Sequence, residues 1–143
     1  MTTSYAVADM MIGVRNMIEA ADLRQGDQVL LLADQGAYNA PSDALAIVAG
    51  GTASAPVTIR GVDSAGNAMA ATITGTRPEP FDPANPPGEE IFRLLNGAGN
   101  LRFSDLAFEN VGTAFRVGAD VHNLTIEHVD ATNVARFFDD MVS

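Results

Sequence analysis

The strongest constraint on the fold is a self-match at a shift of 23 residues near the C-terminal end of the chain. Residues 100–103 (NLRF) align with residues 123–126 (NLTI), and the register then holds to the last phenylalanine. A sequence period of about 20 to 50 residues indicates stacked units of secondary structure. The equivalent positions are Leu101/Leu124, Phe103/Ile126, Leu106/Val129, Asn110/Asn133, Val111/Val134 and Phe92/Phe115/Phe138.

The length of this unit suits about three short strands with their turns, which is one coil of a right-handed parallel β-helix. Equivalent residues then lie about 4.8 Å apart along the axis. The apolar equivalents are expected to point inward, whereas Asn110 and Asn133 are expected to form a structural ladder of side-chain amide hydrogen bonds. The sequence therefore predicts an all-β fold, a short right-handed parallel β-helix of about four to five coils with a period near 23.

The start of the chain follows a different pattern. Between residues 4 and 25, apolar residues recur at helical spacing, with Ser4 as the expected N-cap and Gly26 as the expected stop. A β-helix exposes its core and an unpaired strand edge at each end. We therefore expect an N-terminal amphipathic α-helix over residues 4–25 that caps the first coil.

The rest of the chain, residues 26–143, reads as the coils of one domain spanning residues 1–143. Short apolar runs separated by Gly, Asn, Asp and Pro predict strands. Residues 78–90 contain five prolines and several acidic residues, which predicts one long acidic loop. The expected strands are residues 29–32, 45–48, 57–60, 72–74 and 91–95.

Composition excludes several classes of function. The formal net charge is −10, and all eight basic residues are arginine. This balance argues against nucleic acid and against an anionic membrane surface as partners. The sequence has no cysteine, which excludes disulfides and thiolate chemistry. No apolar stretch has membrane-spanning length. The first four residues contain no basic residue, so the sequence shows no recognisable signal peptide.

Two segments carry a resemblance to a known group of proteins. Residues 22–38 (DLRQGDQVLLLADQGAY) and 51–61 (GTASAPVTIRG) resemble the first coils of right-handed parallel β-helix proteins of the pectate lyase, chondroitinase B and alginate lyase-like group. The resemblance implies a polysaccharide partner and a secreted or extracellular location. In these lyases Lys and Arg act near a Ca²⁺ ion on later coils. The chain has no Lys, so we expect no complete catalytic site in it.

Two arginines and an aspartate form one column of the predicted stack. Arg93, Arg116 and Asp139 fall at equivalent positions and are expected to point outward. Stacked arginines repel each other unless an anion lies between them. One interpretation is that Arg93 and Arg116 recognise a uronate carboxylate. The other is that they pair with nearby acids such as Asp139 or Glu90.

A second set of outward polar residues lies on the two matching repeats. Asp105 and His128 are equivalent and are candidate substrate-binding residues; together they would make a His–carboxylate pair, which supports a general base. Glu127, Asp130 and Asp139 are candidate ligands for Ca²⁺, which needs several oxygens converging on one point. The alternative is a surface polar pair for Asp105 and His128, and a solvated acidic face for the candidate Ca²⁺ ligands.

Two functions remain open. In the first, the chain is the N-terminal portion, or a short relative, of a polysaccharide-active β-helix protein without a complete catalytic site of its own. In the second, it is a structural module that forms homo-oligomers through an uncapped C-terminal coil, where Phe137 and Phe138 begin a new turn. Fold alone does not decide between them.

Overall fold

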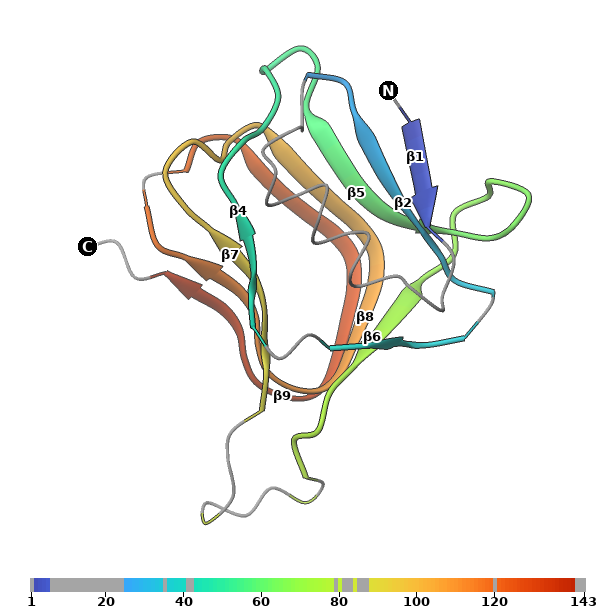
Figure 1. The fold of residues 1–143 in the computed structure, drawn as a ribbon, viewed down its shortest axis with the longest axis vertical. Coiled ribbons are helices and arrows are strands. Elements are labelled where there is room, and N and C mark those ends of the chain that lie inside the picture. Colours follow the sequence, from blue (N-terminus) through green and yellow to red (C-terminus); the bar gives the residue numbers. More distant parts are fainter. Residues whose placement is uncertain are drawn as a thin grey trace.

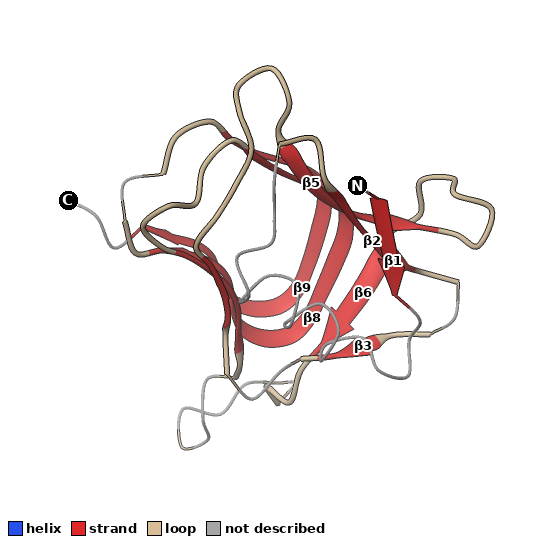
Figure 2. Ribbon diagram, turned by 45° about the horizontal axis from the view of Figure 1, so that its top comes forward, coloured by secondary structure: helices blue, strands red, loops and turns tan. Residues whose placement is uncertain are grey.

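The computed structural model describes residues 2–5, 25–34, 36–40, 43–78, 80, 84, 88–119 and 121–140. Within these ranges the chain forms nine strands of one curled sheet and no helix (Figure 1; Figure 2). The predicted all-β class is therefore confirmed for the described residues. The strands are β1 (Thr2–Tyr5), β2 (Gln28–Leu32), β3 (Tyr38–Asn39), β4 (Leu45–Ile47), β5 (Val57–Val62), β6 (Ala71–Thr74), β7 (Glu90–Leu94), β8 (Leu101–Val117) and β9 (Leu124–Asp140).

Strand β8 organises the sheet. Its first part pairs with β5, its middle with β6 and its last part with β7, while β9 runs along its other edge. Strand β5 continues to β2 and β1, β6 continues to β3, and β7 continues to β4. All these pairings are parallel, so the sheet consists of three columns of parallel strands joined through β8 and β9.

The two long strands bend at matching residues. In β8 the backbone takes a positive φ at Asp105 (55°) and Asn110 (57°), and in β9 at His128 (52°) and Asn133 (51°). Asn, Asp and His adopt this left-handed conformation more readily than other non-glycine residues. Asn100 and Asn123 take it just before each strand begins. These corners turn each 17-residue strand through the curl seen in Figure 2.

The 23-residue period is confirmed by the pairing of β8 with β9. Leu101 lies opposite Leu124, Leu106 opposite Val129, and Phe115 opposite Phe138. The asparagine ladder is also confirmed, because Asn133 Nδ2 donates to Asn110 Oδ1 at 3.0 Å. A second such pair, which the sequence analysis did not predict, joins Asn123 Nδ2 to Asn100 Oδ1 at 2.7 Å.

The core lies inside the curl. The inward residues of β2, β5, β6, β7 and β8 are fully buried, as their alternating pattern requires. Phe115 lies at the centre, with its ring stacked on Phe92 and edge-on to Phe103, Phe108 and Phe137. Aromatic pairs in these arrangements stabilise a core beyond the area that they bury.

The N-terminal prediction requires a correction. Ser4 lies inside strand β1, which pairs in parallel with β2, so it does not cap a helix that begins there. Strand β1 pairs with the backbone edge of β2, the edge that a helix was predicted to cover. The remainder of the predicted helix, residues 6–24, lies outside the described residues. Gly26 lies in a turn with φ 79°, and its N–H donates to the carbonyl of Ala55 at 3.0 Å.

The five predicted strands are confirmed as β2, β4, β5, β6 and β7. The predicted 78–90 loop falls largely outside the described residues, although Glu90 already belongs to β7. Glu89 closes the base of this segment, because its carboxylate accepts from Thr76 N at 3.0 Å and from Thr76 Oγ1 at 2.8 Å.

Candidate functional site

A polar groove lies on the outer surface of four neighbouring strands, β2, β5, β8 and β9. It encloses a cavity of about 590 Å³. Thr58 and Arg60 on β5, and Arg102 and Ser104 on β8, occupy alternate positions, which share one face of a sheet. We call this surface the polar groove. It is lined by Gln28, Thr58, Arg60, Ala68, Arg102, Ser104, Asp105, Glu127 and His128.

Parallel register places the groove residues in two rows. Gln28, Thr58 and Arg102 form one row across β2, β5 and β8. Arg60, Ser104 and Glu127 form the next row across β5, β8 and β9. The rows run along the direction in which the strands stack.

Hydrogen bonds fix several of these side chains before any ligand arrives. Arg60 Nε donates to Gln28 Oε1 at 3.1 Å, and the Arg102 guanidinium pairs with the Glu127 carboxylate. Ser104 is buried, and its hydroxyl donates to Asp105 Oδ2 at 2.6 Å. Two arginines and two carboxylates therefore line the groove, and each is held by a hydrogen bond or an ion pair.

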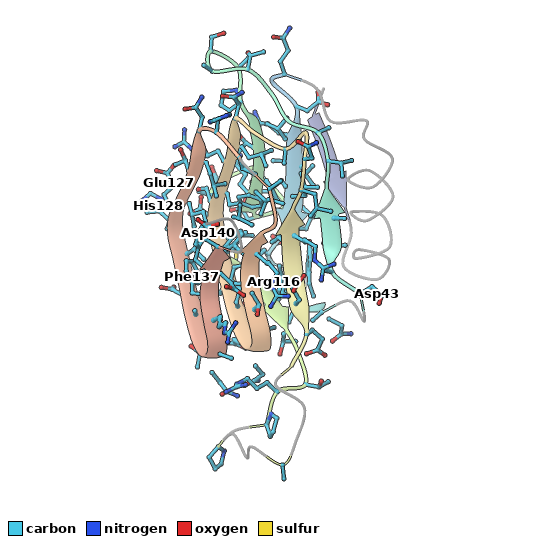
Figure 3. All side chains as sticks on the ribbon, turned by 90° about the vertical axis from the view of Figure 1, so that its left-hand side faces the viewer. Asp43, Arg116, Glu127, His128, Phe137 and Asp140 are labelled. Carbon is cyan, nitrogen blue, oxygen red and sulfur yellow. The ribbon has the colours of Figure 1, made fainter. Side chains whose placement is uncertain are left out.

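The structure brings the predicted pair Asp105 and His128 to the same groove. Both lie at left-handed corners, one on β8 and one on β9. Asp105 accepts its hydrogen bond from Ser104. His128 and Glu127 lie together on the outer side of β9 in Figure 3. The corner conformation gives each of these positions a structural reason for its residue type, independent of any chemistry.

The predicted Arg93, Arg116 and Asp139 column forms an ion network on β7, β8 and β9. Glu90 accepts from Arg93 Nε at 2.6 Å and contacts Arg116 at 2.8 Å. Asp139 contacts Arg116 at 3.2 Å and Arg136 at 3.3 Å. The interpretation that these arginines pair with Glu90 and Asp139 is confirmed.

A second cavity, of about 450 Å³, adjoins this ion network. We call it the arginine cavity. Its backbone wall is tight, because a Cβ added to Gly112 would lie 2.6 Å from the carbonyl oxygen of Gly88. It is lined by Arg77, Gly88, Glu90, Gly112, Thr113, Arg116, Ala135 and Arg136.

The predicted calcium ligands do not converge. Glu127 pairs with Arg102 in the polar groove, whereas Asp139 pairs with arginines of the ion network. Asp130 is exposed on β9. In the part of the chain that the structure describes, no group of three or more acidic or histidine side chains is placed to hold a metal ion.

An apolar cavity of about 440 Å³ opens beneath β9. Phe138 is 46% exposed there, although its equivalents Phe92 and Phe115 are fully buried. Phe138 does lie opposite Phe115, as the period predicts. The prediction that its side chain is buried is wrong, because no described strand covers it. The cavity is lined by Val117, Ala119, Val121, Leu124, Ile126, Phe138 and Asp140.

Sequence reasoning missed Arg60, Arg102 and Ser104 as groove residues. Arg102 lies between the inward residues Leu101 and Phe103, so alternation alone would have placed it outward. The sequence could not predict that Arg60 lies opposite Ser104 in the sheet, because β5 and β8 are not related by the 23-residue shift.

No family model, no curated protein and no solved structure matches the chain, so the resemblance drawn from residues 22–38 and 51–61 stays a prediction. Among the described residues, no helix is long and apolar enough to cross a bilayer.

Proposed function

We propose that the curled sheet is a short right-handed parallel β-helix and that its polar groove binds a polysaccharide chain. Three columns of parallel strands, with β8 and β9 each passing through all three, support the β-helix interpretation. The stack would comprise about four to five coils, as the sequence predicts. The chain would be the N-terminal portion, or a short relative, of a polysaccharide-active protein.

The observation that carries this proposal is the continuity of the groove across four stacked strands. Neighbouring strands lie about 4.8 Å apart, so the groove extends for roughly 14 Å along the stack. An extended polysaccharide presents hydroxyl groups at a repeating interval that is similar to the spacing of neighbouring strands. Rows of fixed donors and acceptors, such as Arg60, Gln28 and Glu127, suit such a repeating ligand.

We propose binding without turnover. Arg102 is paired with the Glu127 carboxylate, and Asp105 already accepts a hydrogen bond from the Ser104 hydroxyl. A general base must reach the proton that it removes and hold a suitable pKa. Fixed and paired side chains serve recognition, where pre-organisation lowers the cost of ordering on binding.

The test is a binding titration of the purified chain against alginate, pectate, chondroitin sulfate and a neutral polysaccharide. Arg102→Ala should weaken binding by about tenfold, because a charge-assisted hydrogen bond from the groove to the polysaccharide is lost. Arg93→Ala is the matched control, since it removes the same charge from β7. Equal losses in the two variants would overturn the assignment of the groove. Unsaturated ends released with Ca²⁺ present would overturn binding without turnover.

A second candidate function is assembly through β9, with a second copy of the chain as the partner. The inward residues of β9 are half-buried or exposed, whereas those of β8 are buried. Among the described strands, β9 pairs only with β8, so its other backbone edge is free for a further strand. The cavity beneath it would be filled by the partner's apolar residues.

Light scattering over a range of concentrations tests this candidate. We expect a dimer or larger species that Phe138→Ser weakens, because the substitution places a hydroxyl in the apolar contact. Thr125→Ser, on the exposed side of the same strand, should leave the mass unchanged. A monomeric mass at the highest concentration would exclude assembly of this chain alone.

A further inference from the structure

The arginine cavity gathers positive charge on a protein of net charge −10. Three of its eight lining residues are arginines, contributed by Arg77 beside β6, Arg116 on β8 and Arg136 on β9. One acidic residue, Glu90, lines the cavity with them. Three arginine side chains around one cavity repel one another unless negatively charged groups of the protein or of a ligand lie between them.

Two of the lining arginines, Arg116 and Arg136, belong to the ion network. Glu90 is shared between Arg93 and Arg116, and Asp139 is shared between Arg116 and Arg136. Within the described part of this network, three guanidinium groups therefore contact two carboxylates. Arg77 lies at the edge of the same cavity, where its Nε donates to the neutral Asn133 Oδ1 at 3.2 Å.

Arg116 carries a further sign of an incomplete site. Its Nε is shielded from solvent and has no hydrogen-bond acceptor among the described residues. A buried donor without an acceptor costs free energy, which a bound oxygen atom or an ordered water next to it relieves. Beside it, Thr113 from β8 lines the cavity and is buried.

We propose that the arginine cavity binds a tetrahedral oxyanion, a phosphate or sulfate group. Guanidinium groups present planar forks of donors that match phosphate and sulfate oxygens. Three such groups around one cavity offer more donors than the two oxygens of a carboxylate accept. Arg136 is the residue that reaches solvent most, with its side chain 65% exposed, and it would make the first contact.

This proposal is independent of glycan binding in the polar groove, because the two cavities share no lining residue. A failure of one assignment therefore leaves the other to be judged on its own experiment.

The probes are inorganic phosphate and inorganic sulfate, titrated into the intact chain by calorimetry at constant ionic strength, with acetate as the carboxylate reference. We expect saturable binding of phosphate, sulfate or both, at least tenfold tighter than binding of acetate. Tighter binding of phosphate would identify a phosphate group as the ligand, and tighter binding of sulfate would identify a sulfate group. Equal binding of all three anions would overturn the proposal.

Arg136→Gln locates the site. It should weaken binding of the preferred anion by about tenfold through the loss of charge-assisted hydrogen bonds. The exposed side chain makes a folding defect easy to exclude by circular dichroism. Arg102→Gln is the charge-matched control, since Arg102 lies in the polar groove, and it should leave anion affinity unchanged. Equal affinities for wild type and Arg136→Gln would place the anion elsewhere and reject the cavity.

Discussion

The side-chain amide of Asn133 donates to Oδ1 of Asn110, 3.0 Å away, at the corner where β9 and β8 turn together. The same Nδ2 atom lies within hydrogen-bond distance of the carbonyl oxygens of Arg77 (3.1 Å) and Pro78 (2.9 Å). One amide thus joins two long strands to the segment that follows β6. This corner is therefore a structural junction of the sheet.

Substitution of Asn133 by Ala should destabilise the protein by about 2–4 kcal/mol, because the junction loses its hydrogen bonds and alanine resists the positive φ. Urea denaturation measures the loss. Asn133→Gly tolerates the backbone conformation and should recover about 1 kcal/mol of it. Asn123→Ala is the control, since its side chain makes one exposed contact with Asn100. A loss in Asn123→Ala as large as that in Asn133→Ala would contradict the junction.

Replacement of Phe115 by Ala should cost about 3–5 kcal/mol, because it opens a cavity at the centre of the aromatic cluster. The ring of Phe115 lies 4.8 Å from that of Phe103 and 5.6 Å from that of Phe92. Phe138→Ala removes the same ring from the next repeat, where it is 46% exposed, and should cost under about 1 kcal/mol in the monomer. Similar losses for both variants would mean that β9 is covered in solution.

The carboxylate of Asp63 should make the protein sensitive to acid. Backbone N–H groups of Asn67 and Ala65 donate to its Oδ1, and these bonds lower the pKa of Asp63, the bond from Asn67 most strongly. A lowered pKa gives a stability contribution that is present above the ordinary aspartate pKa and is lost as pH falls through the lowered value. The apparent pKa is measured by NMR titration of the side chain. Asp63→Asn should flatten the acid limb of the stability curve, whereas an unchanged limb would refute the assignment.

Tyr38 should make the protein lose stability as pH rises into the alkaline range, the opposite direction to Asp63. Its ring is buried, and its hydroxyl faces the backbone near Leu32 without a hydrogen bond of regular geometry to a described residue. Burial raises the pKa of Tyr38 above its ordinary value. Its contribution is therefore fully present below about pH 10 and is lost as pH rises towards the raised value. Tyr38→Phe should reduce this alkaline loss and change stability at neutral pH by under about 1 kcal/mol. Thermal melts from pH 7 to 11 would contradict this if both proteins lost stability equally.

The sequence predicted the last repeats well because nothing interrupts them. The paired residues of β7, β8 and β9 all lie 23 positions apart, so periodicity, alternation and the asparagine ladder agree. Earlier strands pair across irregular distances. Val57 lies opposite Leu101, and Gln28 opposite Thr58, because the loops between strands differ in length. No fixed shift reveals those pairings.

Local pattern also misled at the N-terminus. Thr2–Tyr5 has a mixed composition, and only its pairing with β2 makes it a strand. The polar groove could not be predicted from local pattern either, because it also depends on how the strands pair. Arg60 and Arg102 line the same groove through the register of β5 and β8, which is a tertiary property. By contrast, Arg116 and Asp139 belong to adjacent repeats, and their pairing followed from the period alone.

The constant register of β8 and β9 makes the 23-residue repeat a unit of length. Since the two strands bend at the same positions and stack side chain on side chain, an in-frame duplication of residues 101–123 would supply its own corners, ladder and inward row. Each inserted copy would lengthen the molecule by about 4.8 Å, the spacing of one strand. The protein would grow by the addition of strands at a fixed cross-section.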